Sequence, residues 1–116
     1  MEQGPQKEQI GAPSYRIFWH QRIKEDFSKI PIALTENIVK AAEFRLSRAP
    51  HRIGQPIKGT ANKLWRIRFD KYRIVYTLKA NEVWVLSVQK REVIYQNRHV
   101  QALLRLALAI HQEIDK

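Results

Sequence analysis

Residues 64–76 read LWRIRF-DK-YRIVY, and the sheet of this protein can be built outward from them. Side chains alternate between the two faces of a β-strand, so those at positions 65, 67 and 69 share one face and Arg66 and Arg68 share the other. The dipeptide at positions 70–71 leads into a second strand that carries Arg73. The stretch therefore predicts a β-hairpin that holds three guanidinium groups close together. Such groups repel one another, and a nucleic-acid phosphate between them would remove that repulsion.

The whole chain is basic, and its charge is unevenly spread. It has 116 residues, a formal net charge of +10, 44% hydrophobic residues and 28% charged residues, which suits one globular domain with a substantial core. Between positions 45 and 73 there is a single acid, Asp70. The cations in the same stretch are Arg45, Arg48, Arg52, Lys58, Lys63, Arg66, Arg68, Lys71 and Arg73. This uneven distribution of charge favours a polyanion-binding surface over a basic surface that serves only solubility.

Composition argues against several other classes. The chain has no cysteine, so it has neither a disulfide framework nor a thiolate metal site. Its four histidines are widely spaced and form no HxxxH pair, so we expect no metal and no cofactor. No apolar run approaches the roughly 20 residues that span a membrane, and the N-terminus lacks a signal-peptide core. We expect a cytoplasmic protein with no membrane partner.

Hydrophobic periodicity and turn residues predict an α+β fold. An N-terminal strand and an αα-hairpin around Pro31 should pack on a small, mainly antiparallel sheet, with a C-terminal helix. Residues 1–14 are expected to be a flexible tail, and residues 15–116 a single domain. The expected elements are a strand at 15–19, helices at 20–30 and 32–48, a cation-rich loop at 49–63, strands at 64–69, 72–78 and 82–88, and a helix at 97–114.

The predicted order of strands and helices resembles that of the RelE/ParE superfamily of toxins, and three sequence fragments agree with it. PIKG at residues 56–59 is similar to its "L-K/R-G" element, and residues 64–76 are similar to its "LWRIR…YRIIY" core. SVQKRE at residues 87–92, followed by Tyr95, is similar to its "V-G-K/H-R-x-x-V-Y" ending. The resemblance covers about residues 15–96 and implies a RelE-like fold.

The resemblance also implies a function and its partners. RelE-like members cleave messenger RNA in the ribosomal A site, whereas ParE-like members inhibit DNA gyrase through protein contacts. Both kinds are neutralised by an antitoxin from the same operon, expected here to be acidic. By position, the RelE-like catalytic residues fall on Arg66, Arg68, Arg73, Arg91 and Tyr95. Tyr95 with its basic neighbours favours the ribonuclease, while arginines at two positions where some RelE-like toxins carry lysine favour the gyrase inhibitor; a plain RNA-binding protein or an inactivated remnant is a third alternative.

Metal-free RNA cleavage requires a base, cations around the phosphate and an acid. The arginines suit the second role, because a guanidinium group matches phosphate oxygens two at a time. Arginine cannot act as the base near neutral pH, which leaves Tyr95, Lys90 or ribosomal RNA, with Arg91 or Lys90 as the acid. Tyr95 has two other interpretations, stacking on a base or closing the edge of the core. Further RNA contacts are expected from Arg52, Lys58, Lys63 and Lys90.

The last predicted helix is apolar around much of its circumference. Such a surface indicates a partner, either the antitoxin or a second copy of the chain in a homodimer, or it completes the core of this domain. The candidate contacts are Leu103, Leu104, Leu106 and Leu108. The expected partners are therefore the antitoxin, in a toxin–antitoxin hetero-oligomer, together with the ribosome and messenger RNA.

Overall fold

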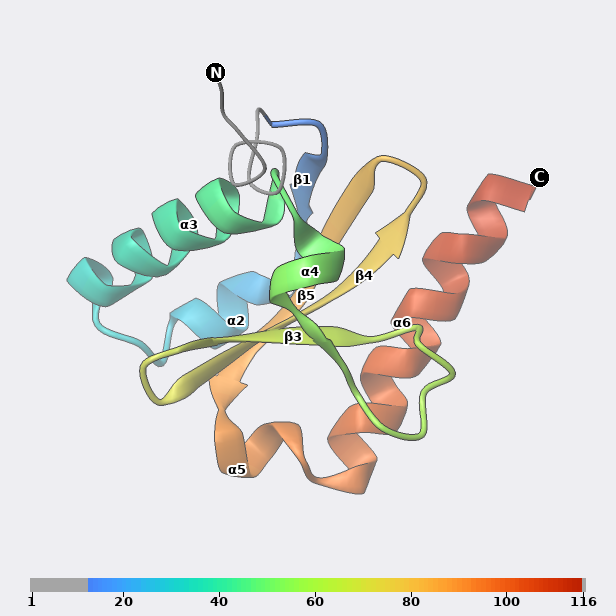
Figure 1. Ribbon diagram of the computed structural model, residues 1–116. Coiled ribbons are helices and arrows are strands. Elements are labelled where there is room, and N and C mark those ends of the chain that lie inside the picture. The colour runs from blue at the N-terminus through green and yellow to red at the C-terminus, as the bar shows by residue number, and fades with distance from the viewer. Residues whose placement is uncertain (1–12, 116) are drawn as a thin grey trace, which may run out of the picture.

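A computed structural model describes residues 13–115, and side chains as far as residue 112 (Figure 1). The predicted tail, residues 1–14, lies outside the described residues except for its last two. The elements are β1 (Arg16–Trp19), α2 (Ile23–Phe27), α3 (Ile32–Leu46), α4 (Pro50–Ile53), β2 (Gln55–Pro56), β3 (Trp65–Phe69), β4 (Tyr72–Lys79), β5 (Glu82–Lys90), α5 (Arg91–Ile94) and α6 (Asn97–Asp115).

One sheet of five strands forms the centre of the molecule, in the order β1-β5-β4-β3-β2. Only β1, which runs parallel to β5, breaks the antiparallel pattern, so the predicted α+β class with a mainly antiparallel sheet is confirmed. The hairpin of β3 and β4 has the expected two-residue connection, because Phe69 pairs with Tyr72. Asp70, and not Lys71, has a positive φ of 56°, so the turn is not of the type that requires left-handed backbone at both positions.

Each face of the sheet has its own core. Toward α2 and α3, buried residues such as Ile38, Leu46 and Ile67 pack together, and toward α6 Leu64 and Leu103 belong to a second cluster. Figure 1 shows α3 in teal and α6 in red on opposite sides of the sheet. Because side chains alternate along a strand, the arginines next to Ile67 lie on the α6 face.

Relative to unbroken alternation, one extra residue in β5 changes the face of the sheet on which the following side chains lie. Val75 pairs with Ser87, but the next residue of β4, Tyr76, pairs with Val85, so Leu86 is a β-bulge. Ser87 consequently lies on the α6 face, where its hydroxyl is 3.1 Å from His99 Nε2.

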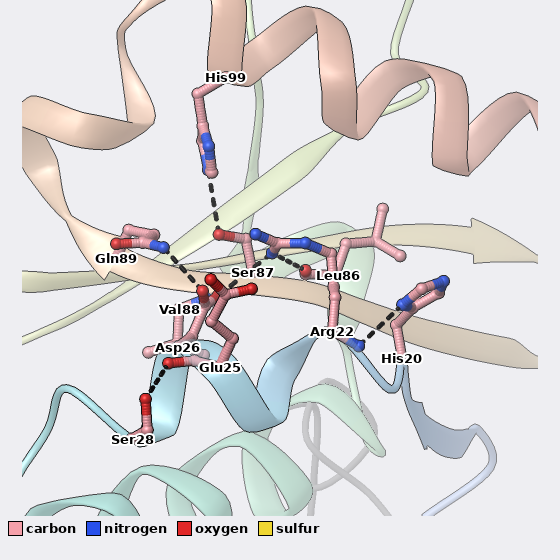
Figure 2. A network of polar contacts seen from close by, with 10 residues as sticks. All are labelled: His20, Arg22, Glu25, Asp26, Ser28, Leu86, Ser87, Val88, Gln89 and His99. Atoms are coloured by element: carbon pink, nitrogen blue, oxygen red, sulfur yellow. Dashed lines mark hydrogen bonds and ion pairs between the residues drawn. The ribbon is translucent and has the colours of Figure 1, made fainter.

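Two side chains close the free edge of β5: that of Asp26 in α2 and that of Arg22, the residue just before α2 (Figure 2). β1 pairs with β5 only as far as Val85. Beyond that point, Arg22 Nη1 donates to the carbonyl oxygen of Leu86 at 2.7 Å, and Asp26, only 2% exposed, accepts from the Val88 amide at 2.9 Å. Asp26 also accepts from Gln89 Nε2 at 2.7 Å and pairs with Arg22 at 3.2 Å. These bonds satisfy backbone groups that an edge strand would otherwise leave unpaired.

The predicted loop at 49–63 contains a short helix and a short strand, which corrects that prediction. It contains the short helix α4, which begins at Pro50 where a proline ring suits the first helical turn. The Tyr76 hydroxyl donates to the carbonyl oxygen of Pro50 at 2.7 Å and holds α4 against the sheet. Burial of this phenol raises the pKa of Tyr76. The strand β2 then pairs with the start of β3.

Two other helical segments differ from the predictions. The first predicted helix, 20–30, is helical only over α2, because turns occupy both of its ends. The one-turn helix α5 follows β5 directly and was not predicted, since four residues are too few to show a helical period.

Candidate functional site

A cavity of about 400 Å³ opens beside the β3–β4 hairpin, lined mainly by basic side chains. All five residues that the resemblance marked as catalytic line it. The described residues that line it are Arg45, Ile53, Gln55, Arg66, Ile67, Arg68, Arg73, Arg91 and Tyr95. Residues distant in sequence therefore converge on one hollow, with contributions from α3, α4, β2, β3, β4, α5 and the residue after α5.

The pairing of β3 with β4 sets the centre of this cavity, where Arg68 lies directly opposite Arg73. Arg73 is only 7% exposed, and its Nη1 donates to the carbonyl oxygens of Tyr72 at 3.1 Å and Asp70 at 3.4 Å. Its Nε is buried and, among the described residues, has no hydrogen-bond partner. A buried polar group without a partner is costly, and Arg73 is one of the residues that line the cavity, so an acceptor that reached this nitrogen would be stabilised.

No described carboxylate neutralises the cavity. Within residues 13–112, none of its arginines takes part in an ion pair; the pair that the structure shows there joins Arg22 and Asp26, on the opposite edge of the sheet. Several like charges in one partly enclosed hollow produce a strong positive potential. The arrangement is suited to hold an oxyanion.

Tyr95 forms one wall of the cavity. Helix α5 starts where β5 ends, so Arg91 and Tyr95 are placed by the same short turn. The guanidinium carbons of Arg66 and Arg91 each lie 5.7 Å from the centroid of the Tyr95 ring, within the range of cation–π attraction. The ring is nevertheless 45% exposed, so it does not close the edge of the core.

Arg45 lines the cavity but was not predicted as a site residue. It lies on α3, and its Nη1 donates to the carbonyl oxygen of Arg68 at 3.0 Å, beyond the point where β2 stops pairing with β3. Its only signal in the sequence was its place at the start of the cation-rich stretch. Gln55 and Ile53 carried no signal, because α4 and β2 were not predicted.

The residues predicted as further RNA contacts lie outside this cavity. Lys58 lines a second hollow, of about 250 Å³, that also has Tyr95 as a wall. Arg52 on α4 and Lys90 at the start of α5 are exposed, and Lys63 is half-buried in the turn before β3. None of these four cations lines the cavity of the β3–β4 hairpin.

The leucines of α6 are placed mainly against the sheet. Leu103 is 1% exposed and belongs to the core cluster on this face, so in this structure its side chain offers no surface to an antitoxin. Leu104 and Leu106 are half-buried against the same cluster, whereas Leu108 is 41% exposed. The helix thus completes the core, one of the alternatives that the sequence left open.

Two features are absent from the described residues. No group of three or more histidine, aspartate or glutamate side chains there is arranged to hold a metal ion. Within the same residues, no helix combines the length and the apolar character needed to cross a bilayer.

Comparison with known proteins identifies the relatives of this chain. The family described as ParE toxin of type II toxin–antitoxin system, parDE, matches residues 17–95. The RelBE2 toxin–antitoxin complex of Mycobacterium tuberculosis contains a chain that is 27% identical, with 69% of this chain and 93% of that chain covered and a TM-score of 0.62. No curated protein matches.

Two more distant structures support the fold. The isolated Escherichia coli RelE toxin is 21% identical, with a TM-score of 0.54 over 79% of this chain and 98% of that chain. The archaeal RelE–RelB complex of Pyrococcus horikoshii contains a chain that is 19% identical, with a TM-score of 0.52 over 67% of this chain and 96% of that chain. The RelE-like fold is therefore established.

Proposed function

The chain belongs to the ParE toxin family of type II toxin–antitoxin systems, and we propose that it is a ribosome-dependent endoribonuclease that cleaves messenger RNA and so inhibits translation. It is a toxin of the RelE/ParE superfamily; the proposal concerns its target and its chemistry. Its partners would be the ribosome, the message and an acidic antitoxin encoded next to it.

One observation carries the proposal. Arg66, Arg68, Arg73 and Arg91 line a single cavity together with Tyr95, and within the described chain no carboxylate pairs with these arginines. A protein that acts only through surface contacts does not require a buried guanidinium whose Nε lacks a partner. A scissile phosphate in the cavity would accept hydrogen bonds from these groups and carry the growing negative charge of the reaction.

The reaction we propose is transfer of the phosphate to the neighbouring hydroxyl. The ribose 2′-oxygen loses its proton and bonds to phosphorus, the bond from phosphorus to the 5′-oxygen breaks, and the departing oxygen takes up a proton. The products are a 2′,3′-cyclic phosphate and a 5′-hydroxyl. Arginines would supply the charge stabilisation that a metal ion provides in other nucleases, so the step is written without a metal.

The proton transfers have fewer candidates than the charge stabilisation. Among the described residues that line the cavity, Tyr95 is the one with a hydroxyl group, and its ring stands beside Arg66 and Arg91. Lys90 is exposed immediately before Arg91. Because proton-transfer groups are few, we propose that the ribosome orients the message and supplies part of the acid–base chemistry.

A second candidate function follows from the family description. The matching family is named for the ParE toxin, and ParE-like members inhibit DNA gyrase, so a gyrase inhibitor without nuclease activity is the alternative. It would leave the unneutralised arginine cavity without a role.

Parallel assays on the purified protein separate the two functions. Primer extension on ribosome-bound messages would reveal cuts, and a gyrase assay would reveal trapped double-strand breaks. We expect cuts that are lost in Arg91→Ala and reduced in Tyr95→Phe, both at exposed residues, and retained in the control Arg105→Ala on the exposed side of α6. Trapped breaks with intact message would reject the nuclease.

A further inference from the structure

The cavity beside the β3–β4 hairpin, called the arginine cavity here, lies next to a second hollow that shares one lining residue with it. This second hollow, of about 250 Å³, is lined by Ile57, Lys58, Gly59, Tyr95, Asn97, Val100 and Gln101. Among the described residues, Tyr95 is the one that lines both spaces. Tyr95 therefore joins a strongly cationic space to one of a different chemical character.

The lining of the second hollow combines an apolar base with a polar rim. Ile57 is buried and Val100 is half-buried, and both belong to the core beneath α6. Asn97 and Gln101 are exposed, and because they lie four residues apart in α6 they project from the same face of the helix. Lys58 adds one cation, so the hollow offers stacking, amide hydrogen bonds and a single charge.

The loop on the other side of the hollow is held firmly. Thr60 is buried, donates from its hydroxyl to the carbonyl oxygen of Ile57 at 2.7 Å and accepts from the Leu64 amide at 3.3 Å. The backbone of Ile57 and Leu64 is also joined directly, at 2.8 Å. Gly59 has a φ of 83°, a conformation that favours glycine, and turns the chain at the rim. The wall is therefore formed before any ligand arrives.

We infer that the second hollow binds a nucleobase, adenine above the others, of a nucleotide whose phosphate occupies the arginine cavity. The inference rests on the proposed function in so far as the ligand is RNA. Nucleotides join a flat, weakly polar base to an anionic phosphate, and the two adjoining spaces divide along the same line. A volume below the range of roughly 300–1,000 Å³ typical of drug-sized ligands suits one base rather than a larger molecule.

The amides provide the base preference. A side-chain amide presents an acceptor and a donor side by side, which matches the N6 and N7 groups of adenine. Single-stranded RNA is commonly recognised in this way, with a splayed base against an aromatic ring and its edge read by side chains. Asn97 and Gln101 are then specificity-determining residues, and Tyr95 is the surface against which the base lies.

Titrations with nucleotides test the inference without the ribosome. Purified protein is titrated with adenosine 3′-monophosphate, adenosine 5′-monophosphate, the corresponding uridine nucleotides and inorganic phosphate, with binding followed by NMR. We expect the better adenosine isomer to bind roughly ten-fold more tightly than inorganic phosphate. The Asn97→Ala/Gln101→Ala variant should lose most of that gain and retain its affinity for phosphate.

Gln112→Ala provides the matched control, because it removes an exposed amide from the same helix far from the hollow. Nucleotides that bind no better than phosphate would overturn the inference, as would a gain that survives loss of both amides. Folding of each variant is checked by its NMR spectrum, and a misfolded double variant is replaced by the two single variants.

The outcome can be separated from that of the proposed function. If nucleotides bind as expected but ribosome-bound messages stay intact, the nuclease is rejected and the nucleobase site is retained. If messages are cut but the double variant leaves both nucleotide affinity and the distribution of cut sites unchanged, the nucleobase site is rejected and the nuclease is retained.

Discussion

Arg22 and Arg73 both pack against the central sheet, yet their surroundings are opposite. Arg22 donates to the carboxylate of Asp26 and to a carbonyl oxygen of β5, and the carboxylate in turn accepts from a backbone amide (Figure 2). Arg73 donates only to carbonyl oxygens near the hairpin turn and, in the described part of the chain, keeps its Nε without a partner. The first cluster is electrostatically complete and stabilises the fold. The second is incomplete, which is the condition expected of a binding site.

The largest effect should come from breaking the complete cluster. Asp26→Ala removes the acceptor of Arg22, the Val88 amide and Gln89 at once, and should lower the free energy of unfolding by about 3–5 kcal/mol, because it leaves buried donors and a charge without partners. Urea unfolding measures the loss. Glu25→Ala, at an exposed carboxylate of the same helix, is the control and should change it by less than about 0.5 kcal/mol. Equal stability of the two variants would show that the cluster is not structural.

Removing a charge from the incomplete cluster, the one around Arg73, should preserve stability and lower activity. Arg68→Ala is expected to leave the free energy of unfolding unchanged or to raise it, since it relieves repulsion with Arg73, while it lowers single-turnover cleavage by roughly 10²–10³-fold. Added phosphate should raise the melting temperature of the wild type more than that of the variant. If Arg68→Ala clearly lowered the free energy of unfolding, Arg68 would have a structural role, and the contrast between the clusters of Arg22 and Arg73 would be wrong.

A smaller effect is expected behind the cavity, where Tyr76 holds α4. Tyr76→Phe leaves the Pro50 carbonyl buried without its donor and should lower the free energy of unfolding by about 1–3 kcal/mol. Tyr15→Phe is the control, because the Tyr15 hydroxyl contacts His51 at an exposed position. Thermal unfolding of the two variants distinguishes a buried anchor from a surface contact.

The smallest expected effect is a pH dependence of the free energy of unfolding, caused by His99 near Arg22 and Asp26. Burial, followed by the nearby charge of Arg22, lowers the pKa of His99 below 6.5, and the opposing charge of Asp26 does not reverse this. Well above pH 6.5 the histidine is neutral in both the folded and the unfolded state. As the pH falls through 6.5, the unfolded chain takes up the proton first, so stability decreases until the pH passes the pKa of the folded state.

His99→Gln should make the free energy of unfolding less dependent on pH as the pH falls below about 6.5, measured by urea unfolding at several pH values. Some dependence should remain, because burial and Arg22 also lower the pKa of His20. An unchanged slope in the variant would show that His99 does not contribute to it.

Local pattern was sufficient for the hairpin and for part of the cavity. The alternation along β3 and the two-residue turn place Arg66, Arg68 and Arg73 on one face, whatever the rest of the chain does. The positions of Arg91 and Tyr95 came instead from the resemblance to a known superfamily, since no short-range pattern connects them to the hairpin.

What could not be predicted depends on contacts across long stretches of sequence. Arg45 reaches the cavity because β2 stops short and exposes a carbonyl of β3, and Asp26 is buried because β1 stops short of the end of β5. Strand lengths and edges are set by tertiary packing, so the partners of a single arginine or aspartate cannot be read from its neighbours. The short elements α4, β2 and α5 were missed for lack of length.

The extra residue Leu86 has a consequence that no point substitution would reveal. Deleting it would leave Ser87 opposite Val75 and the following residues on their present faces, but it would remove a fully buried side chain from the core beneath α6 and the local bend that a bulge gives to the strand. Because α5 starts where β5 ends, the directions of Arg91 and Tyr95 depend on that bend. When related chains are aligned, the number of residues between Val85 and Tyr95 is therefore as informative as their identity.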